Sequence, residues 1–272
     1  MANVRPSPIA GRWYPRSAGE LAQSVDRYLD EAEVEPPSGE VIGLVAPHAG
    51  LLYSGGVAAH AFKCARGLEV DSVAVVSPSH YIDSAPLLTT AHDAYHTPLG
   101  DVPVDRESLD RVAGSVELRP VAEDPEHALE IELPFLQRAL AGGRFKLIPV
   151  MMRDQTRELS EALGRALAKA LRGRKALLVA SSDLSHFYPR PVADALDAVI
   201  LERINAYDPA GLIEAEDRGQ GYACGRGAIA AVLWAARDLG ATQARVVKHA
   251  TSGDVNGDYS QVVGYGAAVI WK

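Results

Sequence analysis

The sequence predicts an α/β protein with a central, mostly parallel or mixed sheet that is covered by helices on both faces. The first observation behind this prediction is that short apolar runs alternate with longer segments of helical spacing. The second is that the apolar runs show no polar alternation, which is typical of strands buried on both faces of a sheet. The composition, 47% hydrophobic and 23% charged over 272 residues, is ordinary for a folded globular protein.

The first half of the chain supplies two helices and two strands in alternation. Residues 21–33 are amphipathic and predict a helix, and residues 56–65 are helical in composition. Between them, residues 41–46 read VIGLVA, and residues 73–76 form a second apolar run. Both runs stop at or just before a proline, as expected where a buried strand ends.

The second half continues the same alternation. Helical spacing predicts helices at 127–141, 159–171, 193–207 and 227–239. Apolar runs predict strands at 145–151, 176–180, 244–251 and 262–271. Pro134 falls within the first of these helices, so it either kinks the helix or marks a later start.

The chain is expected to form one domain, residues 1–272. It contains no internal repeat, low-complexity tract or linker-like stretch. Its two cysteines, Cys64 and Cys224, are too few for a disulfide framework. The sequence shows neither a signal-peptide pattern nor an apolar run of the roughly 20 residues that a membrane-spanning helix needs. We therefore expect a cytoplasmic protein with no membrane partner.

The charge pattern argues against a nucleic-acid partner. The net charge is −8, and no block of Lys or Arg is long enough to form a nucleic-acid footprint. The short basic stretch 172–175 lies between a predicted helix and a predicted strand, so a solvated turn is the better interpretation. The acidic balance favours solubility and does not identify a substrate.

Polar residues follow three of the predicted strands, where open α/β sheets collect their ligands. The segments are Pro47-His48-Ala49-Gly50, Ser77-Pro78-Ser79-His80 and Ser181-Ser182-Asp183-Leu184-Ser185-His186. A fourth cluster, Glu126-His127, opens a predicted helix. Imidazole is the commonest protein ligand for zinc, iron and copper, so converging strand ends predict a metal site. Any single histidine is more often a satisfied polar group or a helix cap, but four such placements favour the site.

Cys224 lies just before a predicted helix, in Tyr222-Ala223-Cys224-Gly225-Arg226. A helix N-terminus lowers the pKa of a thiol, so a thiolate here could bind a metal or act as a nucleophile. The alternative is an ordinary buried thiol, which is what we expect of Cys64.

A serine hydrolase is a weaker interpretation of the segment 181–186. Its Ser, Asp and His residues lie within six positions, whereas catalytic triads are assembled from distant segments. The sequence contains no G-x-S-x-G motif, and its glycines after the first strand match no nucleotide-binding motif. The remaining histidines are weaker candidates: His60 and His249 are expected to be structural, and His92 and His96 lie in a turn-rich segment.

Together these segments resemble the Memo family, the Memo component of the AmmeMemoRadiSam set. The match extends in order from about residue 5 to about residue 270. Its segments are Ala10-Gly11-Arg12-Trp13-Tyr14-Pro15, Ala46-Pro47-His48-Ala49-Gly50, Ser77-Pro78-Ser79-His80, Glu126-His127, Leu133-Pro134, Ile148-Pro149-Val150, Ser181-Ser182-Asp183-Leu184-Ser185-His186 and Cys224-Gly225-Arg226.

The resemblance implies a fold like that of the class III extradiol dioxygenases, which hold Fe(II) with two His and one carboxylate. It implies a shifted ligand set of His48, His80 and Cys224 in this chain. A thiolate ligand makes copper or zinc possible beside Fe(II). The resemblance also implies AMMECR-type and radical SAM proteins of the same system as partners, besides a small-molecule or peptide substrate.

Other residues of the site follow from the same resemblance. His127, Asp183 and His186 match residues that line the pocket, and Trp13 matches an aromatic near its mouth that has been linked to peptide binding in the family. As ionisable groups beside the ligands, His127 or His186 would act as general acid or base, with Asp183 orienting an imidazole.

Three functions are open at this point. The first is a redox enzyme of the non-haem iron, dioxygenase-like type. The second is a non-catalytic protein that binds a metal, iron or copper, or a peptide. The third is a metal-dependent hydrolase.

Overall fold

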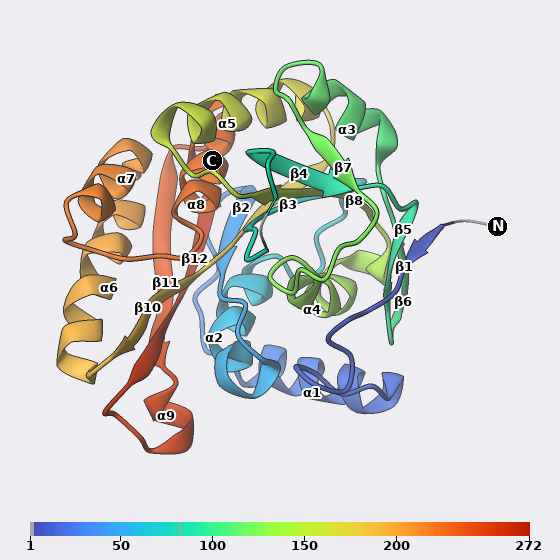
Figure 1. Ribbon diagram of the computed structural model, residues 1–272. Helices are drawn as coiled ribbons and strands as arrows, with labels where there is room; N and C mark the ends of the chain where they lie inside the picture. Colours follow the sequence, from blue (N-terminus) through green and yellow to red (C-terminus); the bar gives the residue numbers. More distant parts are fainter. Residues whose placement is uncertain (1–2, 82) are drawn as a thin grey trace.

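One large mixed sheet organises the protein in the computed structural model, which describes residues 3–81 and 83–272 (Figure 1). Within these residues the sheet has nine strands in the order β10-β12-β2-β9-β3-β8-β4-β7, and β11 also pairs with β12. The strands are β2 (Val41–Ala46), β3 (Ser72–Pro78), β4 (Leu87–Thr90), β7 (Arg119–Val121), β8 (Lys146–Met152), β9 (Ala176–Ser181), β10 (Asp183–Tyr188), β11 (Gln243–Thr251) and β12 (Val262–Trp271).

The four central strands are parallel and set the direction of the sheet. β2 pairs with β9, β9 with β3 and β3 with β8, all in parallel register. β12 joins β2 in antiparallel register, and β4 joins β8 in the same way. β2 and β3 are buried along their whole length, as apolar runs without alternation predict. The predicted mostly parallel or mixed sheet is confirmed.

Helices cover both faces of this sheet. One layer contains α1 (Ala18–Glu31), α2 (Leu51–Cys64) and α4 (Leu133–Ala139), which lie below the sheet in Figure 1. The opposite layer contains α3 (Arg106–Ala113), α5 (Arg157–Leu171) and α8 (Arg226–Asp238). α6 (Arg190–Asn205) packs on β10, β11 and β12, and α7 (Pro209–Asp217) joins α6 to α8.

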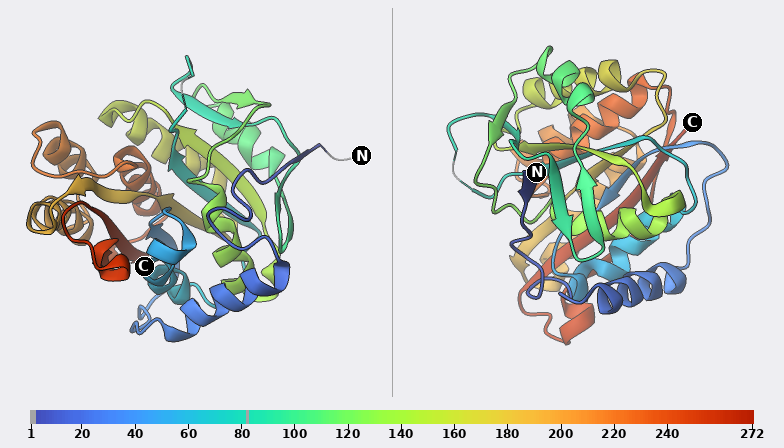
Figure 2. Two further views of the ribbon diagram at one scale, coloured as in Figure 1. Left: turned by 60° about the horizontal axis from the view of Figure 1, so that its bottom comes forward. Right: turned by 90° about the vertical axis from the view of Figure 1, so that its right-hand side faces the viewer.

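Smaller elements complete the described part of the chain. β1 (Val4–Arg5), β5 (Ala94–Thr97) and β6 (Gly100–Pro103) form a separate three-stranded sheet, seen beside the N-terminus in the right-hand view of Figure 2. The short helices are η1 (Glu130–Glu132), η2 (Ala141–Gly143) and α9 (Gly253–Asn256). No helix in the described ranges combines the length and apolarity needed to cross a membrane.

The position of α8 depends on a close approach to α5. A Cβ atom at Gly164 would lie 2.7 Å from the carbonyl oxygen of Ala231, which is closer than side chains tolerate. Glycine at this position therefore lets the two helices touch through their backbones. The contact positions the middle of α8 against α5, and Cys224 lies two residues before the start of α8.

The predicted helix 127–141 begins later than expected. α4 starts at Leu133 with Pro134 in its first turn, and η1 precedes it. Because proline lacks an N–H and suits the first helical turn, Pro134 marks a late start rather than a kink. The segment 126–129 is consequently a loop, and His127 does not open a helix.

Two local features are absent from the sequence-based prediction. β10 begins at Asp183, with only Ser182 between it and β9. The turn-rich segment around His92 and His96 contains the hairpin of β5 and β6. The predicted single domain 1–272 includes residues 1–2 and 82, which lie outside the described residues.

Candidate metal centre

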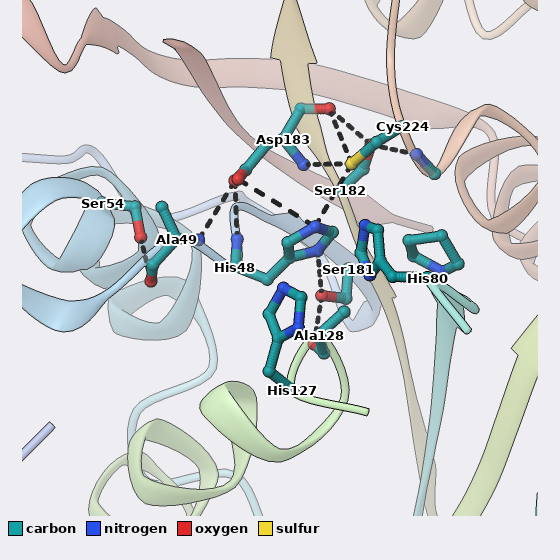
Figure 3. A network of polar contacts seen from close by, with 12 residues as sticks. His48, Ala49, Ser54, His80, His127, Ala128, Ser181, Ser182, Asp183 and Cys224 are labelled. Carbon is teal, nitrogen blue, oxygen red and sulfur yellow. Dashed lines mark hydrogen bonds and ion pairs between the residues drawn. The ribbon is translucent and has the colours of Figure 1, made fainter. Parts of the chain in front are cut away.

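Three side chains from separate segments converge at the carboxyl ends of the central strands (Figure 3). His48 follows β2, His80 follows β3, and Cys224 precedes α8. One ligand atom from each lies within 4.8 Å of the others. Cys224 Sγ is 3.2 Å from His48 Nε2, and the rings of His48 and His80 meet edge to face at 5.4 Å. Two imidazoles and a thiol at this spacing suit a metal such as zinc, copper or iron.

His48 is held from behind by a hydroxyl group. Its Nδ1 lies 2.9 Å from Ser181 Oγ, so Nε2 faces Cys224. Burial lowers the pKa of His48 to about 3, and the positive charge of His80 adds to this effect. His48 is therefore neutral, which is the form of imidazole that binds metals. Ser181 in turn contacts the buried Glu132, at 2.7 Å from Oε1.

His80 is held by a carboxylate. Glu126 accepts the backbone N–H of His80 at 2.6 Å and lies 3.0 Å from its Nδ1. This carboxylate–histidine pair fixes the ring and directs Nε2 outward, as in many metal sites. Burial alone would raise the pKa of Glu126, but hydrogen bonds from His80 and Ala128 hold it down, at about 2.

The thiol of Cys224 is not ionised by its position near a helix, contrary to the sequence-based prediction. Burial raises the pKa of Cys224 well above its usual range, and the negative charge of Asp183 adds to this effect. The backbone N–H of Asp183 approaches Sγ at 3.2 Å and favours the thiolate without outweighing burial. A divalent cation bound at this point would deprotonate a coordinating thiol.

Asp183 supports the backbone at the site. Its Oδ1 accepts the N–H groups of His48 at 2.8 Å and Ala49 at 3.3 Å. Its Oδ2 is 4.0 Å from His48 Nε2, so Asp183 orients the His48 main chain more directly than an imidazole ring. Burial raises the pKa of Asp183 to about 6.

Trp13, His127 and His186 lie on the open side of the centre. The ring of His127 stacks on His80 at 4.7 Å and lies 4.1 Å from Trp13. Burial lowers the pKa of His127 to about 3, and the proximity of the His48 and His80 imidazoles adds to this effect. His186 packs near Tyr222 at 5.6 Å, and burial lowers its pKa as well.

A cavity of about 470 Å³ brings the predicted site residues together. They are Trp13, His48, His80, His127, Asp183 and His186. Cys224 lines a second cavity of about 750 Å³ instead, and contacts the first set through His48. Phe187 stands at the mouth with 69% of its surface exposed and φ of 63°, a left-handed conformation that costs free energy in a non-glycine residue.

A second grouping of His80, Glu126 and His127 also has ligand atoms within 4.8 Å. Glu126, however, already accepts N–H groups from the backbone of His80, His127 and Ala128 and contacts the His80 ring. A carboxylate engaged in this way supports a ligand rather than serving as one. The donor set that fits a metal is therefore His48, His80 and Cys224.

Sequence reasoning noted Glu126 and Ser181 but gave them no role, and it missed Glu132. A signal for Glu132 was present, because it is a carboxyl group within the apolar stretch Ile131 to Leu136. The histidines expected to be structural include His60 and His249, which contact the Gly56 carbonyl and Asp197. These two lie outside the cavity.

The fold and this pocket define a class of α/β proteins with a His/His/Cys grouping at the carboxyl ends of a mixed sheet. The family model described as "Memo-like protein" matches residues 5–269. MEMO1 family proteins of Pyrobaculum aerophilum and Methanococcoides burtonii are each 37% identical, over 99% and 98% of this chain and 99% and 100% of theirs. This chain belongs to the Memo family.

A solved structure of low sequence similarity supports the fold alone. It is an uncharacterized protein of Escherichia coli K12, with a TM-score of 0.50 and 14% sequence identity. The likeness covers 85% of this chain and 100% of that one.

Proposed function

We propose that this Memo-family protein is a metal-dependent redox enzyme of the non-haem iron type, with Fe(II) at His48, His80 and Cys224. The observation that carries the proposal is the excess of ionisable groups. His127, Asp183 and His186 line the cavity beside the ligands, and metal binding alone does not require them. Copper and zinc are alternative metals, because thiolate is a softer ligand than the carboxylate of the related dioxygenases. When bound, the metal would supply redox chemistry toward O₂ or an oxidisable substrate.

The chain's own residues would bind the substrate and move its protons. Neutral His127 can accept a hydrogen bond from a substrate hydroxyl, since its lowered pKa keeps both ring nitrogens from being protonated at neutral pH. Asp183 has a pKa of about 6, which is closer to working pH, and its Oδ1 makes the two backbone contacts. Trp13 would cover the substrate from the side of His127.

Oxygen uptake tests this proposal. Protein loaded anaerobically with Fe(II) is exposed to O₂ in the presence of catechols and related aromatics. We expect oxygen consumption that is stoichiometric with product and absent from a Cys224→Ala control. Uptake no greater than that of the control would refute a redox function.

A second candidate function is peptide or metal binding without turnover. Exposed aromatic side chains at the mouth of the cavity, Phe187 and Tyr53, favour it, because such residues are common at binding surfaces. Saturable binding of an aromatic peptide, with no oxygen uptake under the conditions above, would support this function. The hydrolase, the AMMECR-type and radical SAM partners and the cytoplasmic location stay predictions.

A further inference from the structure

A third cavity adjoins the metal pocket on the side of α1. It has a volume of about 510 Å³ and shares Arg12 and Trp13 with the metal pocket. Its other walls come from the turn before α1, from α1 itself and from the start of α2. The two cavities therefore form neighbouring compartments that one extended ligand could occupy.

This third cavity, which adjoins α1, is rich in arginine. Arg12, Arg16 and Arg27 line it, and among the described lining residues only Glu20 is acidic. None of the three guanidinium groups forms an ion pair with a carboxylate of the described ranges, whereas arginines elsewhere do, such as Arg138 with Asp26. The concentration of positive charge contrasts with the net charge of −8.

A hydrogen-bonded turn at residues 11–14 positions Arg12 and Arg16. Gly11 has φ of +82°, and a Cβ there would lie 3.0 Å from Arg16 Nε, so glycine lets Arg16 fold back over the turn. The Gly11 N–H donates to the Tyr14 carbonyl at 2.8 Å, and the Tyr14 hydroxyl donates to the buried Glu130 at 2.6 Å. The guanidinium of Arg27 lies 5.2 Å from the ring of Tyr28.

We propose that this three-arginine groove (Arg12, Arg16 and Arg27) binds the oxyanion of a substrate whose other end enters the metal pocket. The inference rests on the proposed function, which identifies the part of the substrate that enters the metal pocket. Guanidinium forks match carboxylate and phosphate oxygens in pairs, so the shared chemistry is a planar or tetrahedral oxyanion.

Binding without turnover tests the groove. The probes are a catechol with a carboxylate side chain, the same catechol with a neutral amide, and inorganic phosphate as a competitor. Calorimetry on the holoprotein should show tighter binding of the carboxylate probe and its displacement by phosphate. Arg16→Gln/Arg27→Gln should weaken the carboxylate probe by about tenfold and leave the amide probe unchanged.

The matched control is Arg144→Gln/Arg172→Gln, which removes two exposed arginines outside the groove. Equal affinity for the two catechols, or an unchanged affinity of the groove variant, would overturn the proposal. This experiment measures binding and not oxygen uptake. A protein that shows no redox activity can therefore still confirm or overturn the proposed oxyanion site.

An independent observation concerns the protons around Ser181. Three polar atoms surround its Oγ: His48 Nδ1 at 2.9 Å, the Ala128 carbonyl oxygen at 2.6 Å and Glu132 Oε1 at 2.7 Å. A serine hydroxyl has one hydrogen to donate and can accept two. An ionised Glu132 and the carbonyl of Ala128 would compete for that one hydrogen, leaving one short oxygen–oxygen contact without a proton.

We also propose that Glu132 is a neutral carboxylic acid and serves as a positioning residue for His48. Glu132 and His48 Nδ1–H then both donate to Ser181 Oγ, which donates to Ala128. Each of the three contacts of Ser181 Oγ then contains one proton. His48 is held in the tautomer whose Nε2 lone pair faces the thiol of Cys224. Burial raises the pKa of Glu132 well above its usual range, and no donor of the described residues reaches its Oε2.

Two variants of similar size separate the neutral acid from a carboxylate. Glu132→Gln keeps a donor for Ser181, so zinc affinity should stay within about threefold of the parent protein. Glu132→Leu removes the donor and should weaken zinc binding by about 10- to 100-fold. If an anion were needed, Glu132→Gln would be as weak as Glu132→Leu, which would overturn the proposal.

Infrared spectroscopy gives a readout that a purely structural role would not change. Protein labelled with ¹³C at glutamate side chains should show a protonated carboxyl band at neutral pH that Glu132→Gln removes. A spectrum with only ionised glutamates would refute the neutral acid even if the variants fail to fold.

Discussion

The two sides of the metal centre are built differently. The inner wall, formed by His48, Ser181 and Glu132, is buried, with His48 only 2% exposed, and Cys224 beside it is partly buried. The outer wall, formed by His80, His127, Trp13 and Phe187, opens toward the cavity, and the His80 side chain is 34% exposed. The comparison indicates that the inner wall fixes the geometry of the imidazole and thiol groups, while the outer wall is accessible from the cavity.

The supports of the two imidazole ligands differ in the same sense. A hydroxyl holds His48 in the buried wall, where an unpaired charge would be costly. The carboxylate of Glu126 holds His80, and the backbone N–H groups of His127 and Ala128 donate two further hydrogen bonds that stabilise the charge of Glu126. The four predictions below test this division, from the largest expected effect to the smallest.

Removal of a ligand should abolish metal binding. In His48→Ala and in Cys224→Ala, elemental analysis of purified folded protein should find no bound metal, because two remaining donors cannot hold the ion. His186→Ala is the control, since it changes the outer cavity and should retain metal. Full metal retention in both ligand variants would contradict the assignment.

Loss of the carboxylate behind His80 should have a smaller effect. Glu126→Gln replaces the charged acceptor behind His80 by a weaker neutral one, so we expect zinc affinity to fall by about 10- to 100-fold in a competition assay with a chelator. The replacement preserves size, and circular dichroism checks the fold. An unchanged affinity would mean that Glu126 only shapes the loop 126–129.

A change at the outer wall should leave the metal in place. Phe187→Gly relieves the left-handed backbone at φ of 63° and should stabilise the protein by about 1 kcal/mol in chemical unfolding. Metal content should be unchanged, while affinity for an aromatic ligand should fall because the exposed ring is lost. Loss of metal from Phe187→Gly would contradict the claim that Phe187, in the outer wall, does not contribute to metal binding.

A carboxylate remote from both walls should affect the stability of the fold and its pH dependence, and should leave metal binding unchanged. Burial alone would raise the pKa of Asp105, but hydrogen bonds from Ser72 and Ser108 and the charge of Arg174 hold it below its usual value. A depressed folded-state pKa stabilises the protein above the unfolded-state pKa, and this contribution disappears as the pH falls through the folded-state pKa.

Replacement of this carboxylate gives the smallest effect. Asp105→Asn should cost about 1 kcal/mol at neutral pH and flatten the acid side of the stability profile, measured by urea unfolding. Metal affinity should not change. A loss of metal in Asp105→Asn would show that distant electrostatics, rather than the two walls, control the site.

The sequence predicts the sheet and the location of the site because both depend on local patterns. Apolar runs without alternation predict buried strands, and the residues after them, His48 and His80, lie at the same edge of the sheet. From the sequence, Pro134 indicates either a kink or a later helix start, and the sequence does not decide between the two. β10 was missed, because the polar residues Asp183, Ser185 and His186 interrupt its pattern.

The supporting residues of the site could not be assigned from the sequence. Ser181 and Glu132 meet only when β9 and the segment before α4 pack together, which no local pattern encodes. The pKa of Cys224 was predicted in the wrong direction. The position of Cys224 before a helix is visible in the sequence, but the desolvation of its thiol beside Asp183 is not, and this desolvation has the larger effect on the pKa.

X-ray absorption on the zinc-loaded protein tests the central claim most directly. The account predicts one sulfur ligand at about 2.3 Å and two imidazole nitrogens at about 2.0–2.1 Å, with the sulfur lost in Cys224→Ser. A zinc site without sulfur, or one in which His127→Ala removes an imidazole from the first coordination sphere, would contradict the assignment of His48, His80 and Cys224.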